Sequence, residues 1–177
     1  LREASGRAEE AIDLYEKILA LEPGCVAAYW RIARAYYWLG EKAGHDEKKL
    51  AIYREGIDFA KLGRERDPES TDCHFWLAAA YGKYAETDGV LQSLHMVPYI
   101  EESLEKVIAI DPSYFNGAAY RVLGRLYHKL PSTHGGDNEK AIETIEKAIA
   151  VNANGSPMTY RFLAEVYLDE GDDDQAR

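Results

Sequence analysis

Hydrophobic residues recur along the chain in one arrangement that occurs four times. An aromatic residue or a histidine leads each copy, an aliphatic and a small residue follow three and four positions later, and a tyrosine stands seven positions after the lead. These spacings place the four side chains on one face of an α-helix. We therefore predict four helices of one kind, the first-type helices, with the sets Tyr29, Ile32, Ala33 and Tyr36; His74, Leu77, Ala78 and Tyr81; Tyr120, Leu123, Gly124 and Tyr127; and Tyr160, Leu163, Ala164 and Tyr167.

A second kind of amphipathic segment alternates with the first, and we call it the return helix. It covers residues 6–23, 52–68, 99–112 and 139–153, with Ala11, Gly56, Ile100 and Ala141 at one equivalent position. Three copies end at a proline, which has no N–H to continue a helix. We expect about eight helices in antiparallel pairs, with the closing tyrosine of each first-type set buried between paired helices. The segment 171–177 is expected to begin one more return helix.

This alternation resembles the tetratricopeptide repeat (TPR) family over nearly the whole chain. The resemblance implies an all-α fold in which helix pairs stack as a right-handed superhelix. His74 departs from the family pattern because a large aromatic residue is usual there, and Ala153 departs because a proline is usual. We interpret residues 1–177 as a single repeat domain, truncated at both ends, with units at about 1–23, 24–68, 69–112, 113–153 and 154–177.

Every repeat is longer than the roughly 34 residues usual for the family. The extra residues fall between the two helices of a pair, at 41–49, 86–98 and 131–139. The first insertion is polar and is expected to extend the return helix from about Asp46. The third contains Gly135 and Gly136 followed by Asp137, which is typical of a loop that ends in a helix cap.

The second insertion differs because it is apolar. Its apolar residues recur at helical spacing, so we predict that residues 89–97 form helix and that this face is covered. Two interpretations stay open: the segment packs against its own repeat, or it walls off the groove of the superhelix or meets another subunit. The residues concerned are Val90, Leu91, Leu94 and Val97.

The resemblance can be narrowed to a smaller group of TPR proteins. Three stretches carry it: HFWLAAAYG (74–82), GVLQSLHMVPYIEESLEKVIAIDPSYF (89–115) and YRVLGRLYHKLP (120–131). They resemble the T component associated with tripartite ATP-independent periplasmic (TRAP) transporters. That resemblance implies a periplasmic protein, lipid-anchored through a missing N-terminal segment, that forms trimers and contacts a solute-binding protein. The chain is also similar to the regulator of microtubule dynamics family, through the long insertion and through Leu123, Gly124 and Arg125. This second resemblance implies a cytosolic scaffold.

The composition and the motifs of the chain argue against several classes of function. With 31 acidic and 21 basic residues the formal charge is −10, which disfavours nucleic acid because nucleic-acid binding depends on neutralising phosphates. No apolar run approaches the roughly 20 residues that span a bilayer. Cys25 and Cys73 are expected to be small buried residues without a disulfide. We find no metal-ligand spacing, nucleophile signature or phosphate loop, so we expect no enzyme activity, no catalytic residue, no metal and no cofactor.

The remaining candidate for a functional site is a surface that binds a partner. First-type helices line the concave side of such a superhelix, and their arginine and aromatic residues are types enriched at binding hot spots. The alternative is that the arginines pair with acids on adjacent helices. The residues expected on this surface are Trp30, Arg34, Tyr37, Phe75, Arg121, Arg125, His128 and Arg161.

We therefore interpret the chain as a non-enzymatic TPR interaction module that binds a protein, with a periplasmic solute-binding protein as the expected partner. Two alternatives stay open. The first is a carrier whose enclosed groove holds an apolar or carboxylated small molecule. The second is a cytosolic protein–protein scaffold.

Overall fold

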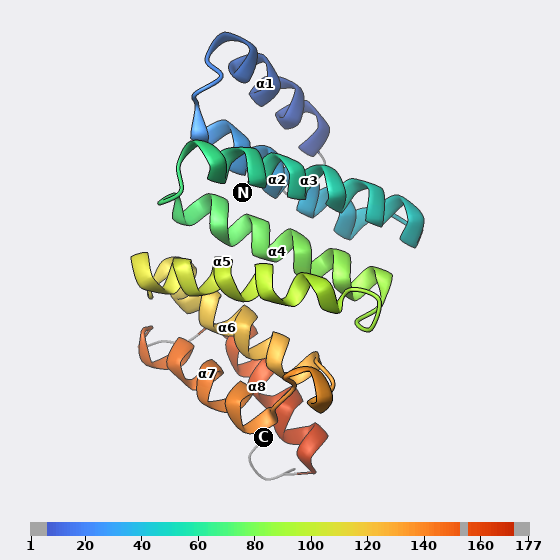
Figure 1. Ribbon diagram of the computed structural model, residues 1–177, viewed down its shortest axis with the longest axis vertical. Helices are drawn as coiled ribbons and strands as arrows, with labels where there is room; N and C mark the ends of the chain where they lie inside the picture. The colour runs from blue at the N-terminus through green and yellow to red at the C-terminus, as the bar shows by residue number, and fades with distance from the viewer. Residues whose placement is uncertain (1–6, 153–155, 172–177) are drawn as a thin grey trace. The chain divides into compact units, whose positions relative to one another are not determined.

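The computed structural model describes residues 7–152 and 156–171, and these residues form eight α-helices and no β-strand (Figure 1). The predicted all-α fold of about eight helices is confirmed. The helices are α1 (Ala8–Leu21), α2 (Val26–Lys42), α3 (Asp46–Arg66), α4 (Thr71–Asp88), α5 (Val97–Ile110), α6 (Tyr114–Lys129), α7 (Asn138–Ala150) and α8 (Pro157–Glu170), with short 3-10 helices η1 (Leu94–Met96) and η2 (Ser132–His134).

The chain divides into two compact units, Leu1–Ser103 and Leu104–Arg177, with the boundary inside α5. The interpretation of residues 1–177 as one domain stays a prediction. Ala153 and residues 172–177, where a further return helix was expected, lie outside the described residues. Within the described part of the chain, no helix has the length and apolar character needed to cross a membrane.

In unit 1, α2 packs against α1, α3 and α4, and α3 packs against α4. Ile32, Leu77 and Tyr53 lie in its core and are almost completely buried. Gly63 on α3 lets the neighbouring helices approach closely. A Cβ atom there would lie 2.9 Å from the Cβ of Tyr29 and 2.6 Å from the Sγ of Cys73.

Unit 2 repeats this arrangement, with α7 packed against both α6 and α8 and with α6 touching α8. Gly124 lies on the face of α6 that meets α7, and a Cβ atom there would lie 2.9 Å from the carbonyl oxygen of Ala141. Ile145 and Val166 are completely buried. The small residue of the repeated set therefore permits close helix packing, as expected.

The closing tyrosines confirm the register of the repeat only in part. Tyr81 and Tyr127 are buried, whereas Tyr36 and Tyr167 are half-buried. Both cysteines are free, as expected, but only Cys73 is buried and Cys25 is half-buried.

The first and third insertions adopt the structures predicted for them. Helix α3 begins at Asp46. Asp137 is the N-cap of α7, and its carboxylate accepts a hydrogen bond from the N–H of Lys140 at 2.9 Å. Gly135 has a φ of 91°, a left-handed conformation that favours glycine, so the chain can turn just before this cap.

The prediction of helix over 89–97 is wrong. Gly89, with a φ of 105°, ends α4, residues 90–93 form a turn, and only the η1 segment and Val97 are helical. The buried Ser93 explains the turn, because its N–H bonds to the carbonyl of Gly89 and its Oγ donates to Asp88 at 3.2 Å. The apolar face is largely covered, since Val90, Leu94 and Val97 are half-buried, but Leu91 is 65% exposed.

Helix α6 has an irregular start that the spacing did not predict. Phe115, Asn116 and Gly117 have φ values of 43°, 59° and 71°, so three consecutive residues are left-handed. A Cβ atom at Gly117 would lie 2.9 Å from the Cα of Ala148 on α7. The glycine therefore permits both the conformation and the close packing at this point.

Candidate functional site

Unit 1 holds a cluster of arginine and tryptophan side chains, which we call the indole–arginine cluster. It consists of Trp30, Arg31 and Arg34 from α2 and Trp76 from α4. Arg34 follows Trp30 by four positions, so the turn of α2 places both on one face, whereas Arg31 is the adjacent residue and its long side chain reaches the ring. The packing of α2 against α4 brings Trp76 to the same place.

The two arginines lie over the faces of the indole rings. The guanidinium carbon of Arg31 is 4.1 Å from the ring centroid of Trp30. That of Arg34 is 5.2 Å from Trp30 and 6.0 Å from Trp76. These distances lie within the range of cation–π attraction. The N–H groups of a guanidinium point outward in its own plane, so a guanidinium over an aromatic ring can still donate to a carboxylate at its edge.

Two aromatic residues support the cluster from the side. Phe75 and Tyr37 contact Trp76 edge-on, with ring centroids 5.4 Å and 5.6 Å away. Phe75 and Trp76 are each 7% exposed, while Trp30, Arg31 and Arg34 are half-buried. Phe75, expected to line the surface, is therefore part of its buried support.

A polar pocket of 250 Å³ lies among the C-terminal ends of α2 and α4 and the start of α3. The Nζ of Lys83 is 3.2 Å from carboxylate oxygens of both Glu41 and Glu86. Tyr53 donates a hydrogen bond to Glu41 at 2.9 Å. Burial and this bond to the carboxylate raise the pKa of Tyr53, so its hydroxyl keeps its proton. The charges of this pocket are therefore satisfied within the chain.

Two arginines of unit 2 pair with the same acid. Arg125 and Arg161 contact the two carboxylate oxygens of Glu165 at 3.3 Å and 2.9 Å. Burial by itself would raise the pKa of Glu165, but the hydrogen bond from Arg161 and the nearby positive charges lower it. The guanidinium of Arg125 also lies 4.5 Å from the ring centroid of Phe162. Arg125 therefore pairs with an acid on an adjacent helix, as the alternative expected, whereas Arg161 pairs with the same acid within α8.

Arg121 and His128 also have partners inside unit 2. Arg121 donates to the hydroxyl of Thr159 at 3.3 Å, and burial lowers its pKa. His128 joins three helices, because its Nδ1 lies 3.0 Å from Asn138 at the start of α7 and its Nε2 lies 3.1 Å from Asp169 on α8. Their use by a partner, and a single surface shared by Arg34 and Arg125, stay predictions.

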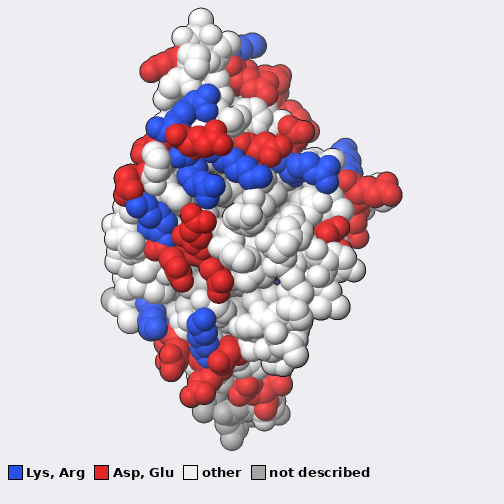
Figure 2. Space-filling model, viewed as in Figure 1, with Lys and Arg blue, Asp and Glu red and all other residues white. Residues whose placement is uncertain are grey.

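Sequence reasoning missed Arg31 and Trp76, which belong to the indole–arginine cluster. It selected the positions one and five residues beyond the leading residue of each first-type set, whereas Arg31 and Trp76 are the immediate neighbours of the selected Trp30 and Phe75. Over the described part of the chain, no group of three His, Cys, Asp or Glu residues comes together as a metal site. Figure 2 shows basic and acidic side chains interspersed over α1 and α3, without a large field of one sign.

Comparison with known proteins decides the family. The family model for regulator of microtubule dynamics proteins 1–3 matches residues 1–177, which is the whole chain. The chain belongs to the regulator of microtubule dynamics family. Bovine regulator of microtubule dynamics protein 3 is 28% identical over 129 residues, covering 73% of this chain and 25% of that protein. Mouse protein 1 is 29% identical over 110 residues, covering 61% of this chain and 35% of that protein.

Solved structures agree with the TPR architecture. TTC0263, a thermophilic TPR protein of Thermus thermophilus, superimposes with a TM-score of 0.70 at 22% identity, covering 97% of this chain and 78% of that chain. MamA superimposes with a TM-score of 0.63 at 22% identity, covering 97% and 83%. At this identity the likeness shows the fold alone.

The expectation of a periplasmic, lipid-anchored protein is wrong. The matching family and its curated mammalian relatives are regulators of microtubule dynamics rather than periplasmic lipoproteins. The trimer and the solute-binding partner rested on the resemblance to the transporter component, and they lose their support with it. This member of the regulator of microtubule dynamics family spans only about a quarter to a third of the length of these relatives.

Proposed function

We propose that this chain is a non-enzymatic interaction module, and that it binds an acidic segment of a partner protein on the indole–arginine cluster. The observation that carries the proposal is the position of Arg34, which lies over the rings of both Trp30 and Trp76. The names of the relatives suggest the regulation of microtubule dynamics as the setting of this binding.

The chemistry of the cluster favours a carboxylate beside an apolar or aromatic group. Arg31 already donates one hydrogen bond to the carbonyl oxygen of Ala27 at 2.9 Å, and a guanidinium group has further N–H groups that can donate in pairs to a carboxylate. The half-buried ring of Trp30 supplies apolar area next to them. Arginine and tryptophan together are the residue types that dominate binding energy at protein interfaces.

The charge of the whole chain limits how such a partner is recruited. With a formal charge of −10, the chain gives an acidic segment no long-range attraction. Binding must therefore come from the short-range contacts of the cluster. Removal of one charged hydrogen-bond partner costs about 1.5 to 3 kcal/mol, which corresponds to roughly a 10- to 150-fold loss of affinity.

The test compares two charge reversals in the same unit. Fluorescence anisotropy measures binding of a fluorescein-labelled, glutamate-rich peptide that contains one phenylalanine, and a lysine-rich peptide of equal length serves as the ligand control. Arg34→Glu should weaken binding at least about tenfold. Arg54→Glu is the matched variant, because Arg54 is exposed on α3 and contacts only Tyr84 among the interactions described for it. It should leave the affinity within about twofold of the parent.

Equal affinities for the two variants, with helical content unchanged in circular dichroism, would overturn the proposal. Equal binding of the glutamate-rich and lysine-rich peptides would also overturn it. Co-sedimentation with microtubules assembled from purified tubulin extends the test to the setting that the relatives suggest. There, the Arg34→Glu variant should remain in the supernatant under conditions in which the Arg54→Glu variant pellets.

A further inference from the structure

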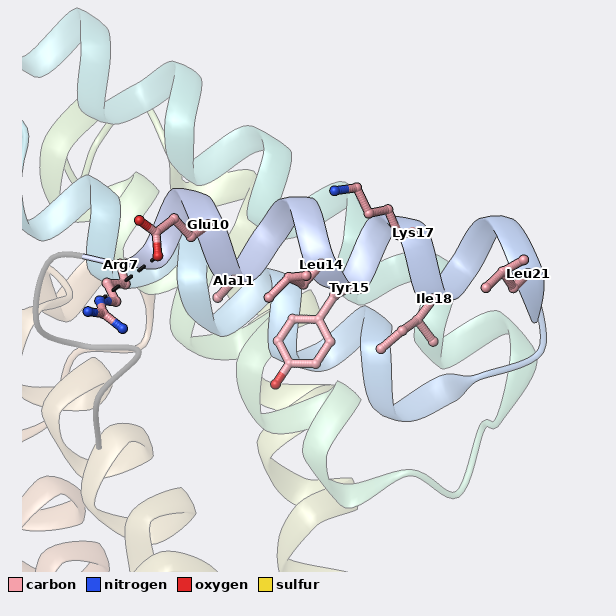
Figure 3. A pocket seen from close by; sticks show the side chains of 8 residues that line it. All are labelled: Arg7, Glu10, Ala11, Leu14, Tyr15, Lys17, Ile18 and Leu21. Carbon is pink, nitrogen blue, oxygen red and sulfur yellow. Dashed lines mark ion pairs between the residues drawn. The ribbon is translucent and has the colours of Figure 1, made fainter.

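Most arginines in the described part of the chain contact an acid or lie over an aromatic ring. Arg7, at the edge of a groove along α1, lies 3.9 Å from a carboxylate oxygen of Glu10, and the dashed line in Figure 3 marks this pair. Arg125 contacts Glu165 at 3.3 Å. Arg121 on α6 differs, because among the described residues it contacts neither an acid nor a ring.

The hydrogen bonds of Arg121 use only one of its three guanidinium nitrogens. Its Nη1 donates both bonds, to the hydroxyl of Thr159 at 3.3 Å and to the carbonyl oxygen of Asn116 at 3.5 Å. Both acceptors are neutral, and both distances exceed the roughly 2.7 to 3.2 Å that is usual for such bonds. The Nε and Nη2 atoms donate to no described residue, and neither is among the fully buried atoms that lack a partner. Both atoms therefore reach the surface.

The two unused nitrogens form the edge of arginine that recognises oxyanions. The Nε–H and Nη2–H groups of a guanidinium lie side by side and donate in parallel to two oxygens of a carboxylate or a phosphate. In Arg121 the opposite side of the group is attached to α8 through Thr159, which is completely buried in the first turn of that helix. The edge is therefore held in one place between α6 and α8.

The charge of Arg121 is not balanced by an acid of the described residues. The side chain is half-buried, and burial lowers its pKa without any carboxylate acting in the opposite direction. One helical turn further along α6, Arg125 contacts Glu165, and the same carboxylate also pairs with Arg161. Residues 153–155, which precede α8 in the sequence, are Ala, Asn and Gly, so they add no acid. Three arginines thus share one carboxylate in this part of unit 2.

We propose that the Nε–Nη2 edge of Arg121 binds a phosphate group, at a site separate from the indole–arginine cluster. Paired donors on an unbalanced positive charge suit an oxyanion. A phosphate monoester carries nearly two negative charges at neutral pH, so it matches the excess of three arginines over one glutamate better than a carboxylate does. Free phosphate and a phosphorylated side chain of a partner protein share this chemistry, and the tests below separate them.

The first test follows the arginine Nε–H signals in ¹H–¹⁵N spectra at neutral pH and low temperature. Arg121→Lys identifies the signal of Arg121 by its loss. Inorganic phosphate should shift this signal more than any other arginine Nε–H signal, because the Nε of Arg121 donates directly to the ion. Sodium chloride at the same ionic strength should leave it in place, and acetate, the carboxylate control, should shift it less than phosphate does.

The second test measures peptide binding by fluorescence anisotropy. The probe is a labelled peptide with one phosphoserine among neutral residues, and the same peptide with serine or glutamate at that position is the control. Arg121→Gln should weaken binding of the phosphopeptide at least about tenfold, and Arg121→Lys should also weaken it, since lysine keeps the charge but lacks the paired donors. Lys147→Gln is the matched variant, because it removes one exposed positive charge from α7 in the same unit, and it should stay within about twofold of the parent.

Each outcome decides one part of the proposal. A response to inorganic phosphate without binding of the phosphopeptide would uphold the site and assign it to free phosphate. Equal shifts of the Arg121 signal in phosphate and chloride would overturn the site, as would phosphopeptide binding that Arg121→Gln leaves unchanged. Equal binding of the glutamate peptide would overturn the preference for phosphate. Arg34→Glu should bind the phosphopeptide like the parent, so this proposal and the acidic-segment proposal fail separately.

Discussion

Replacement of Gly63 by alanine tests whether the helices of unit 1 pack as closely as the structure requires. A Cβ atom at this position would lie 2.9 Å from the Cβ of Tyr29 and 2.6 Å from the Sγ of Cys73. The Cβ of Tyr29 is fixed to the backbone of α2, and Cys73 is completely buried in the first turn of α4. The Cβ of Tyr29 cannot move without moving α2, so the extra methyl group must separate packed helices.

The expected magnitude follows from two opposing effects. Overpacking by one methyl group in a tight core typically costs about 1 to 3 kcal/mol. The change from glycine to alanine in a helix contributes about 1 kcal/mol in the opposite direction. Gly82 on α4 isolates the second effect, because a Cβ atom there meets no atom within 4 Å. Gly82→Ala should therefore stabilise the fold by about 0.5 to 1 kcal/mol.

Urea unfolding followed by tryptophan fluorescence is the assay, because all three tryptophans lie in unit 1 with both glycines. The helix-propensity gain is common to both variants, so the unfolding free energies should differ by about 1 to 3 kcal/mol. With a slope of about 1.5 kcal/mol per molar urea, the midpoints should differ by roughly 0.7 to 2 M. Equal stabilisation of both variants would show that Gly63 has room for a side chain, and it would refute the close packing.

Three further substitutions in unit 2 are best measured by circular dichroism in urea. Asp137→Ala removes the N-cap of α7 and should cost about 1 kcal/mol, with Asp137→Asn keeping most of the stability. His128→Leu removes the hydrogen bond to Asn138 and the close contact with Asp169 from a side chain that is 5% exposed, and it should cost about 0.5 to 1.5 kcal/mol. The lowered pKa of Glu165 means that its pairing stabilises the fold above the ordinary value of 4.5 and that this is lost at lower pH. The advantage of the parent chain over Glu165→Gln should therefore shrink between pH 7 and pH 3, and a constant difference would contradict the pairing.

Local signals in the sequence were enough to predict the helices and two of the three insertions. Spacing indicated the first-type faces. Asp137 caps α7 by accepting a hydrogen bond from a free N–H group, and Asp46 places an acidic residue in the first turn of α3. The helix prediction for residues 89–97 was wrong because it rested on the spacing of apolar residues and ignored the effect of Gly89. Its left-handed backbone ends α4, and the buried Ser93 then stabilises a turn through its bond to Asp88.

The partners of the charged side chains in the candidate site could not be predicted from sequence spacing. Arg125 and Glu165 are 40 positions apart in sequence, and their contact depends on how closely α6 and α8 approach. In the sequence, an arginine at this position of the repeat looks the same whether its side chain pairs with an acid, lies over an aromatic ring or does both. The packing of α2 against α4 places Arg34 over two indoles, and the approach of α6 to α8 places Arg125 against both Glu165 and the ring of Phe162.

The central claim, that an acidic segment binds at the indole–arginine cluster, is tested most directly by the indole N–H signals in a ¹H–¹⁵N spectrum. The chain has three such signals, from Trp30, Trp38 and Trp76, which Trp→Phe variants assign. Addition of the glutamate-rich peptide should shift the signals of Trp30 and Trp76 most, with Trp38 as an internal reference, and the lysine-rich peptide should shift neither. Unmoved Trp30 and Trp76 signals at millimolar peptide, or equal shifts with both peptides, would contradict the account.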